Sequence, residues 1–215
     1  MEYLHLALIL ALSYVVGSFP TSIVLGKIFF GTDIRRHGSG NAGGTNAFRV
    51  FGHAAGVVVI VIDIAKGVAA VLLIARLPTF GAIDAPLLPA DAAALLAGCA
   101  AVVGHIWTVF ASFRGGKGVA TAAGMVVALY PQAFAVTLPV FVLAVALSGI
   151  VSVGSLTAAV VFALSVFLLD LTGVATASLL LRSAAIAIAL LIIYTHRSNI
   201  GRLLRGEETR TFGKQ

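Results

Sequence analysis

The sequence predicts an all-α integral membrane protein with seven transmembrane helices. Of the 215 residues, 60% are hydrophobic and 10% are charged, and the mean hydropathy is +1.09. This is far more apolar surface than one soluble core of this length could bury. The apolar residues also form runs of about 20, the length that a membrane helix needs. Finally, the 14 Lys and Arg residues gather mostly between these runs, where they can set membrane topology.

The first apolar run, residues 3–30, is expected to stay as a membrane helix. No basic segment precedes it, and Glu2 stands ahead of it, unlike a cleaved secretory signal. Lys27, Arg35 and Arg36 follow, so the positive-inside rule places the amino terminus outside and this loop in the cytoplasm. The first three spans are predicted near residues 4–26, 55–76 and 92–112.

Charge assigns the later connections to one side or the other. The proline-containing stretch 77–91 has only Arg76 at its edge and is predicted to be external. The chain then returns to the cytoplasm at Arg114 and Lys117. A final span near 177–195 precedes a basic tail, so the carboxyl terminus is also predicted to be cytoplasmic. This tail contains Arg197, Arg202, Arg205, Arg210 and Lys214.

Both ends of 118–195 therefore lie on one side, which requires an even number of crossings. Pro131 can split 118–148 into two short crossings, with external turns near 131 and 171–176. This gives seven helices, and five is the alternative. Residues 148–155 then form a cytoplasmic turn, and all the polar clusters share the cytoplasmic face. We expect a single transmembrane domain over residues 1–215, without a soluble domain.

The first polar cluster occupies residues 38–49. Its closely spaced glycines permit positive φ, which allows successive N–H groups to surround anionic oxygens. Asn41, Thr45 and Asn46 add neutral donors, and Arg49 adds a planar cation suited to phosphate. A flexible glycine turn between helices is an equally good interpretation of this cluster alone. Its spacing matches neither the dinucleotide-binding nor the Walker motif.

The second cluster is Gly115-Gly116-Lys117-Gly118, directly before the apolar run that begins at Val119. The free amides of this helix start, the positive end of the helix and the Lys117 ammonium are expected to face one anion. The alternative is a basic topology signal at a helix boundary. One lysine would serve that purpose without three glycines, which favours anion binding.

In the third cluster, His196 and Asn199 are three residues apart and would share one face if the last helix continues. Such a histidine can bind a substrate hydroxyl or act as a base near neutral pH. An interfacial histidine in a basic tail is the alternative. Ser39 has no evident Asp-His relay, so a serine nucleophile is not established.

Other groups point to structure rather than chemistry. Asp63 and Lys66, three apart in the second apolar run, are predicted to form an ion pair that braces the bundle, with a functional role as the alternative. Cys99 is interpreted as a small core residue. No metal site is expected, because the remaining histidines have no carboxylate or cysteine at ligand spacing. Nucleic acid is not an expected partner, since almost every cation lies within reach of a membrane helix.

Taken in order, these motifs resemble the bacterial membrane acyl-phosphate:glycerol-3-phosphate acyltransferase family over essentially the whole chain. Gly44, Thr108 and Gly154 depart from the residues usual there. The matching segments are Gly17-Ser18-Phe19-Pro20, residues 33–41, Thr45-Asn46 with Arg49, Asp63 with Lys66-Gly67, Gly104-His105, residues 113–121, Ser152 and residues 196–207.

The resemblance implies transfer of a fatty acyl group from acyl phosphate to the 1-hydroxyl of glycerol 3-phosphate, giving lysophosphatidic acid and phosphate, the first acylation of phospholipid synthesis. It implies seven helices in the bacterial inner membrane, a cytoplasmic active site and no cofactor. A soluble acyl-phosphate synthase is a candidate partner, because the donor is unstable in water. Glu207 is expected to be structural. By carry-over, the catalytic residues are Ser39, Arg49, Lys117, His196 and Asn199, and the substrate-binding residues are Asn41, Thr45, Asn46, Gly115, Gly116 and Ser152.

The chemistry fits these residue types. Acyl phosphate is an activated mixed anhydride, so direct attack needs neutralised phosphates, an aligned hydroxyl and a stabilised oxyanion. The base is either His196 or a substrate phosphate oxygen. The main rival function is a phosphate or organophosphate transporter, although no inverted repeat is visible. A second rival is an acyltransferase with a thioester donor, but no histidine here is followed five positions later by aspartate.

Overall fold

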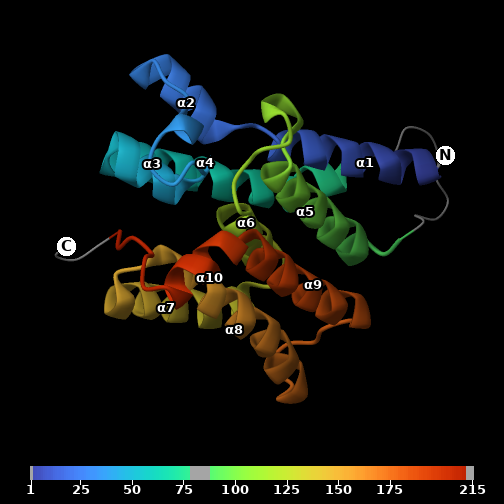
Figure 1. Cartoon of the computed structure of the whole chain (residues 1–215). Helices are drawn as coiled ribbons and strands as arrows, with labels where there is room; N and C mark the ends of the chain where they lie inside the picture. The colour runs from blue at the N-terminus through green and yellow to red at the C-terminus, as the bar shows by residue number, and fades with distance from the viewer. Residues whose placement is uncertain (1, 78–87, 212–215) are drawn as a thin grey trace. The chain divides into compact units, whose positions relative to one another are not determined.

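The computed structural model describes residues 2–77 and 88–211. Their regular structure consists of α-helices and short 3-10 turns (Figure 1). The chain divides into two compact units, Met1–Leu129 and Tyr130–Gln215. Most of the predicted external loop at 77–91 lies outside the described residues.

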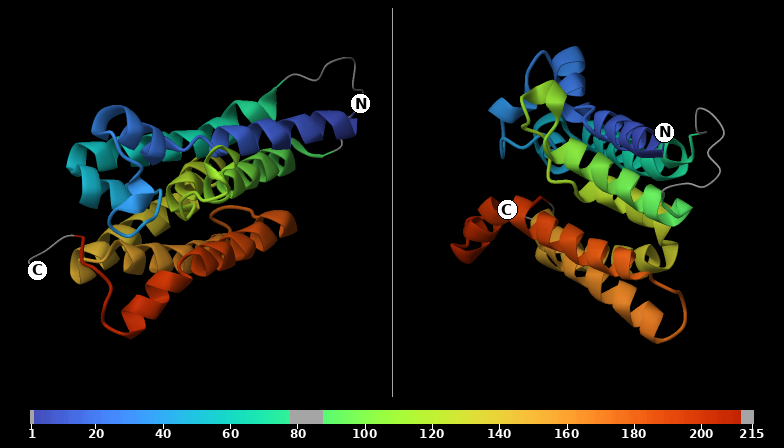
Figure 2. Two further views of the ribbon diagram at one scale, coloured as in Figure 1. Left: turned by 45° about the horizontal axis from the view of Figure 1, so that its top comes forward. Right: turned by 90° about the vertical axis from the view of Figure 1, so that its right-hand side faces the viewer.

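Unit 1 contains four long or medium apolar helices that pack on one another. Helix α1 (Glu2–Gly17) packs against α4 (His53–Leu72) and α5 (Ala90–Ile106), and α6 (Val119–Leu129) packs against α4 and α5 (Figure 2). The shorter elements connect these helices, and all but η2, which follows the end of α4, flank the polar loops. They are α2 (Thr21–Phe30), η1 (Ile34–Arg36), α3 (Gly44–Phe51), η2 (Ile74–Arg76) and η3 (Val109–Ala111).

Unit 2 is built around α8 (Val151–Leu171), which packs against both α7 (Pro131–Ser148) and α9 (Leu179–Thr195). Pro131 begins α7, where its missing N–H costs nothing, and the chain between 118 and 148 is divided into two helices at the predicted residue. Gly149 has φ +70 and ends α7 in the left-handed conformation. The chain leaves α9 through a 59° bend into α10 (Arg197–Leu204).

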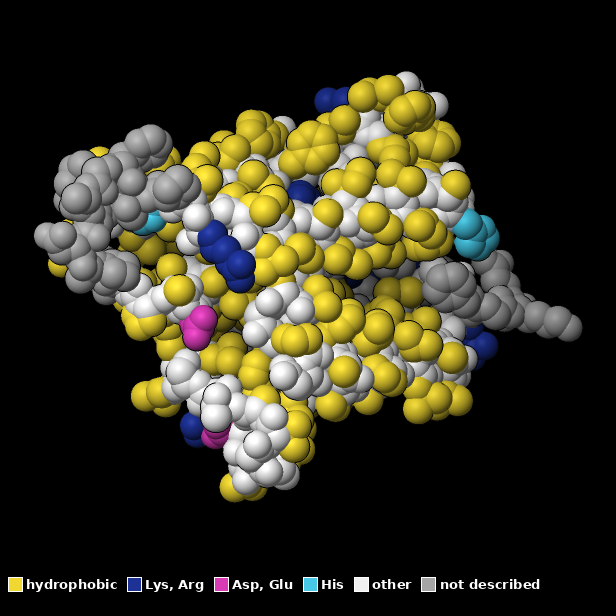
Figure 3. Space-filling view, turned by 180° about the vertical axis from the view of Figure 1, so that it is seen from behind, with side chains coloured by type: hydrophobic (Ala, Val, Ile, Leu, Met, Phe, Trp, Pro, Cys, Tyr) yellow, Lys and Arg dark blue, Asp and Glu magenta, His cyan; other side chains and the backbone are white. Residues whose placement is uncertain are grey.

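The apolar helices have the length and surface of membrane spans. Within the described residues, five stretches are long and apolar enough to cross a membrane, and the bent pair α9 and α10 would make a sixth. Helix α6 is apolar but shorter. Outward-facing Leu147 and Leu171 are at least 80% exposed, and hydrophobic side chains cover most of the face in Figure 3. The protein is therefore an all-α multi-pass membrane protein.

The first span is not one continuous helix, contrary to the prediction for residues 4–26. Helix α1 ends at Gly17 and α2 begins at Thr21, with Ser18, Phe19 and Pro20 between them. Pro20 has no N–H to donate to a helical ladder, and its ψ of 70° is not helical. The break places the Phe19 carbonyl and the Thr21 hydroxyl beside α4, where both take part in the polar cluster described below.

Glycines allow the helices of unit 1 to approach closely. A β-carbon on Gly124 of α6 would lie 2.0 Å from the Ile64 carbonyl oxygen of α4, and one on Gly67 would lie 2.1 Å from the Thr121 oxygen. Helices α1 and α5 meet in the same manner at Gly17 and Gly104. Such small-residue contacts let backbones pack where lipid provides little hydrophobic drive for association.

Replacement of Gly124 with alanine should therefore destabilise the protein, because its β-carbon meets a backbone atom that cannot rotate away. We expect a loss of about 1–3 kcal/mol, as for other overpacked cores. Thermal denaturation in detergent would measure it. Gly201→Ala is the control, since that β-carbon would lie 3.4 Å from the flexible Arg205 side chain. Equal melting temperatures for the two variants would contradict the proposed packing.

Candidate functional site

The first polar cluster is a loop followed by a short helix. Gly38 and Gly40 have φ of +58 and +72, which confirms that this loop uses positive-φ glycines. Ser39 and Asn41 lie in the loop. Thr45, Asn46 and Arg49 lie on α3, where Thr45 and Arg49 are four residues apart and share one face.

The side chain of Asn46 holds this loop together. It is 1% exposed, and its Oδ1 accepts from the Ser39 amide at 2.9 Å. Its Nδ2 donates to the carbonyls of His37 and Asn41 at 3.0 Å and of Ile34 at 3.3 Å. Asn46 therefore positions the loop from within, a role that its residue type alone did not reveal.

The same region shows that two amides are not available to the predicted backbone anion nest. The Ser39 amide donates to Asn46, and the Gly40 amide donates to the His37 carbonyl at 3.1 Å. Both amides are thus used to close the loop. The groups of this cluster suited to an anion are the side chains of Ser39, Asn41, Thr45 and Arg49.

An ion pair fixes the neighbouring turn. Arg35 donates from Nε and Nη2 to Asp33, the latter at 2.7 Å, and from Nη1 to the Ala111 carbonyl at 2.9 Å. The side-chain hydrogen bond from Arg35 lowers the pKa of Asp33 to about 2, so the carboxylate stays charged at neutral pH. Arg35 is thereby neutralised and ties the first polar loop to η3 rather than offering a cation to a ligand.

The second cluster joins the end of α5 to the start of α6, as predicted. The Gly115 amide donates to the Ile106 carbonyl at 3.0 Å, and the Gly116 amide donates to the His105 carbonyl at 3.1 Å. The amides of Gly115 and Gly116 therefore satisfy the last carbonyls of α5 and do not face an anion. Lys117 and the first turn of α6 remain as the elements of this loop that are predicted to bind an anion.

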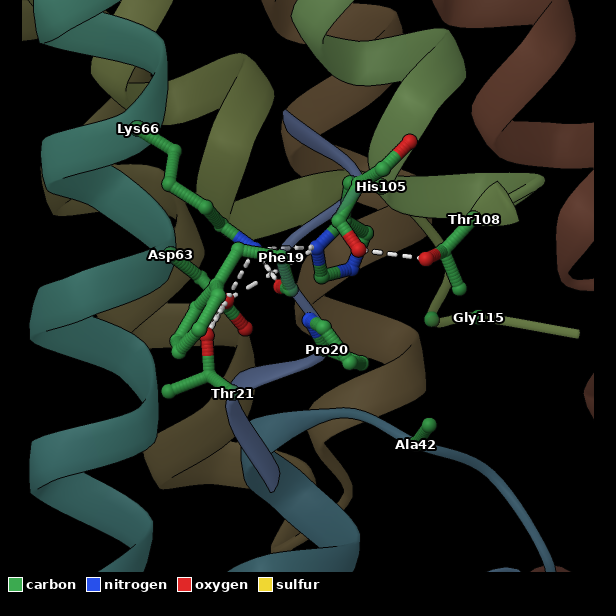
Figure 4. A pocket seen from close by; sticks show the side chains of 11 residues that line it. Phe19, Pro20, Thr21, Ala42, Asp63, Lys66, His105, Thr108 and Gly115 are labelled. Atoms are coloured by element: carbon green, nitrogen blue, oxygen red, sulfur yellow. Dashed lines mark hydrogen bonds and ion pairs between the residues drawn. The ribbon is translucent and has the colours of Figure 1, made fainter. Parts of the chain in front are cut away.

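A buried polar cluster lies beside this loop (Figure 4). The predicted Asp63–Lys66 ion pair is confirmed, with Nζ 2.7 Å from Oδ1. Sequence spacing did not reveal its third member, His105, whose Nδ1 lies 3.4 Å from the Lys66 ammonium. Gly115, Gly116 and Ala42 line a small cavity with this cluster, with room for about 10 Å³ of solvent. The cavity beside the cluster is thus lined by residues of both polar loops of unit 1.

Unit 2 holds the third cluster. His196 is 2% exposed at the bend between α9 and α10, and its Nδ1 donates to the Ile192 carbonyl at 2.8 Å. This bond places the proton of the neutral ring on Nδ1, which leaves the lone pair on Nε2. Asn199 lies on α10 and is also buried.

Glu208 is the organiser of this cluster, whereas the sequence analysis named only its neighbour Glu207, as a structural residue. The Glu208 side chain is 2% exposed and accepts from Asn199 Nδ2 at 2.7 Å, Ser152 Oγ at 3.1 Å and Arg202 Nε at 2.6 Å. Burial raises the pKa of Glu208, but these hydrogen bonds outweigh it and hold the pKa below its usual value. Glu207 is exposed and pairs with Arg205.

Ser152 lies in a different local structure from the one predicted. Residues 148–155 were expected to form a turn, but α8 begins at Val151 and Ser152 stands in its first turn. The turn itself consists of Gly149 and Ile150. Ser152, predicted to bind substrate, and Asn199, predicted to be catalytic, are both held by Glu208. Within the described residues, no three His, Cys, Asp or Glu side chains lie close enough to hold a metal ion.

Comparisons with known proteins agree with these motifs. Residues 7–206 match the family model of glycerol-3-phosphate acyltransferase. Proteins of that name from Chlorobaculum tepidum and Chlorobium luteolum are 45% and 47% identical, each over 96% of this chain and 97% of the relative. The crystal structure of PlsY (YgiH), an integral membrane glycerol 3-phosphate acyltransferase in its glycerol 3-phosphate form, superposes with a TM-score of 0.82. That match covers 97% of this chain and 96% of PlsY at 36% identity. With its polar clusters and apolar helices inside the matched region, this chain belongs to the glycerol-3-phosphate acyltransferase family.

Proposed function

We propose that this protein transfers a fatty acyl group from acyl phosphate to the 1-hydroxyl of sn-glycerol 3-phosphate, forming lysophosphatidic acid and phosphate. The observation that carries the proposal is family membership over nearly the full chain. Related PlsY structures are described in a glycerol 3-phosphate form and a lysophosphatidic acid form, which are the acceptor and the product of this reaction. Acyl phosphate as donor follows from the family resemblance of the sequence motifs.

In unit 1, we assign the substrate phosphates to the cations and hydroxyls of the two polar loops. Arg49 and Lys117 are the cations, and the start of α6 adds its positive end beside Lys117. Ser39, Asn41 and Thr45 supply neutral donors. We assign an indirect role to Asn46, Gly115 and Gly116, because their polar groups hold the loops in place.

In unit 2, we assign proton transfer to His196 and its support to the Glu208 cluster. The Nδ1–H of His196 is directed at the Ile192 carbonyl, so Nε2 is the basic atom of the neutral ring. Asn199 and Ser152 are fixed by Glu208 and supply polar groups near the bend. That the clusters of both units form a single site stays a prediction of the sequence motifs.

The chemistry requires no covalent intermediate. The glycerol hydroxyl attacks the carbonyl carbon of the mixed anhydride, the carbon–oxygen bond to phosphate breaks, and phosphate leaves with the electron pair. Arg49 and Lys117 offset the charge of the two phosphate groups, so that donor and acceptor can approach each other. The hydroxyl proton passes to His196 or to a phosphate oxygen.

For the membrane arrangement, we propose seven crossings, with the amino terminus outside and the carboxyl terminus in the cytoplasm. The support is charge: Arg35, Arg114 and Arg197 follow alternate crossings on one predicted side. This places the polar clusters at the cytoplasmic face of the bacterial inner membrane, within one transmembrane domain. A soluble acyl-phosphate synthase would deliver the unstable donor there.

The proposal is tested with purified protein in detergent or lipid cubic phase. We expect palmitoyl phosphate and glycerol 3-phosphate together to give lysophosphatidate and phosphate, and each alone to give none. Palmitoyl-CoA replaces palmitoyl phosphate in a parallel assay. Product with palmitoyl-CoA but not with palmitoyl phosphate would overturn the choice of donor. If folded protein gives no product with either donor, a transporter would be favoured.

Replacing His196 with glutamine separates the two candidate bases. If Nε2 takes the proton, kcat should fall by about 100-fold or more with a smaller change in KM, the usual contribution of a general base. Steady-state kinetics between pH 6 and 9 would measure both parameters. Near-normal turnover would instead identify a substrate phosphate oxygen as the base.

A further inference from the structure

A buried ionisable cluster in unit 1 lies where the end of α1, the middle of α4 and the end of α5 meet (Figure 4). The side chains of Asp63, Lys66 and His105 are only 2%, 6% and 7% exposed. Ionisable groups at such positions in membrane helices are costly and commonly serve a function. A bracing ion pair explains why Asp63 and Lys66 are buried together, but it does not explain the presence of His105.

Lys66 does not serve as a substrate ligand, because all three of its N–H donors are used. Its Nζ lies 2.7 Å from Asp63 Oδ1, 2.9 Å from the Phe19 carbonyl oxygen and 3.4 Å from His105 Nδ1. An ammonium group has three donors and no acceptor. The Thr21 hydroxyl also donates to Asp63 Oδ1, at 2.8 Å. The pair is thus satisfied within the protein.

The Lys66 contact determines the orientation and protonation of His105. Because an ammonium group can only donate, Nδ1 must accept, and the neutral ring carries its proton on Nε2. The Nε2 edge of the ring faces the second polar loop, where a β-carbon on Gly116 would lie 2.1 Å from Nε2. The imidazole is therefore the surface against which the Gly116 backbone packs.

The backbone of the same residue holds this loop as well. The His105 carbonyl accepts from the Gly116 amide, and the next carbonyl, of Ile106, accepts from the Gly115 amide. Lys117 follows directly. Ala42, next to Asn41 in the first loop, lines the same small cavity as Gly115 and Gly116. Because Gly116 packs on the imidazole and directly precedes Lys117, a displacement of the imidazole would also displace the backbone of Lys117.

We propose that His105 is a positioning residue for Lys117. The buried Asp63–Lys66 pair holds the imidazole, the imidazole and its carbonyl hold the Gly115–Gly116 backbone, and this backbone sets the place of the ammonium that binds a substrate phosphate. The inference rests on the proposed function, in which Lys117 contacts a phosphate. Misplacement of a binding group by about 1 Å can cost roughly 100-fold in rate, so such a support has kinetic consequences.

The test compares His105→Leu with His105→Asn. Leucine keeps apolar bulk but removes the acceptor for Lys66, whereas the asparagine oxygen can occupy nearly the place of Nδ1. We expect His105→Leu to raise KM for a phosphate substrate and to lower kcat/KM by about 10- to 100-fold. His105→Asn should recover most of this loss. In a Lys117→Ala background, His105→Leu should have little further effect, as expected for residues that act as one unit.

Val166→Ala provides a control for lost stability alone. Val166 is 0% exposed on α8 in unit 2, so this change opens a cavity without touching the loop. It should lower the melting temperature and leave KM unchanged. If His105→Leu behaves like Val166→Ala, or if its effect and that of Lys117→Ala are additive, the inference is overturned.

If His105→Leu does not fold, the cycle is repeated with His105→Gln, whose longer side chain moves the amide acceptor away from the Nδ1 position; a wild-type KM for this variant would overturn the inference. An inactive but folded wild-type protein would overturn the proposed function, and the role of His105 with it.

Discussion

Replacing Lys117 with alanine should abolish most acyl transfer while leaving the fold intact. Lys117 stands between a glycine pair fixed to the end of α5 and the first turn of α6. In the proposed site its ammonium and the positive helix end act on the same phosphate. Loss of one preorganised electrostatic group at a reacting centre commonly costs about 100-fold or more in rate. Phosphate release with both substrates present would measure the loss.

Lys27→Ala is the matched control for this experiment. Lys27 is also a cation at a helix end near the predicted cytoplasmic face, but it is exposed in the last turn of α2. It should change the rate by less than about twofold, because an exposed charge contributes little at a distance. Equal losses in the two variants would show that net positive charge, rather than the position of Lys117, supports activity. Lys117→Arg should recover only part of the activity, because the guanidinium is larger and planar.

Hydropathy and charge predicted the helices well, because each depends on a run of residues rather than on one contact. The split at Pro131, the start of α6 after Gly118 and the Asp63–Lys66 pair were all predicted from local pattern, and the structure contains them. The break at Ser18–Pro20 was missed. Apolar residues continue through it, so hydropathy cannot distinguish a bent helix from a straight one there.

The direction of hydrogen bonds was beyond the reach of sequence. Glycine-rich loops predict exposed amides, but the amides of Gly115 and Gly116 lie over the end of α5 and bind its carbonyls. His105 and Asp63 are 42 positions apart, so no spacing rule brings them together. Asn46 resembles a ligand by type and turns out to hold its own loop. A side chain suited to bind substrate is equally suited to bind backbone, and only packing decides.

Sequence also could not tell which of the neighbours Glu207 and Glu208 would hold the third cluster. Replacing Glu208 with glutamine should lower both stability and activity. Glutamine can keep an acceptor for Asn199 and Ser152 only by turning its amide N–H₂ toward the Arg202 donor. Two donors then face each other in a mostly buried site. We expect a loss of about 2 kcal/mol in stability, as for a hydrogen bond to a charged group. Activity should fall with it, because Asn199 and the bend beside His196 lose their anchor.

Glu207→Gln is the control, since Glu207 is exposed and pairs only with the exposed Arg205. It should change stability by less than about 0.5 kcal/mol. The pH dependence adds an independent test. The folded-state pKa of Glu208 lies below its ordinary value of 4.5, so the carboxylate stabilises the fold fully above that value and loses this contribution as pH falls through its lowered pKa. The gap in melting temperature between wild type and Glu208→Gln should therefore narrow below about pH 4.5. A gap that stays constant from pH 7 to pH 3 would show that the glutamine acts through shape rather than through the missing charge.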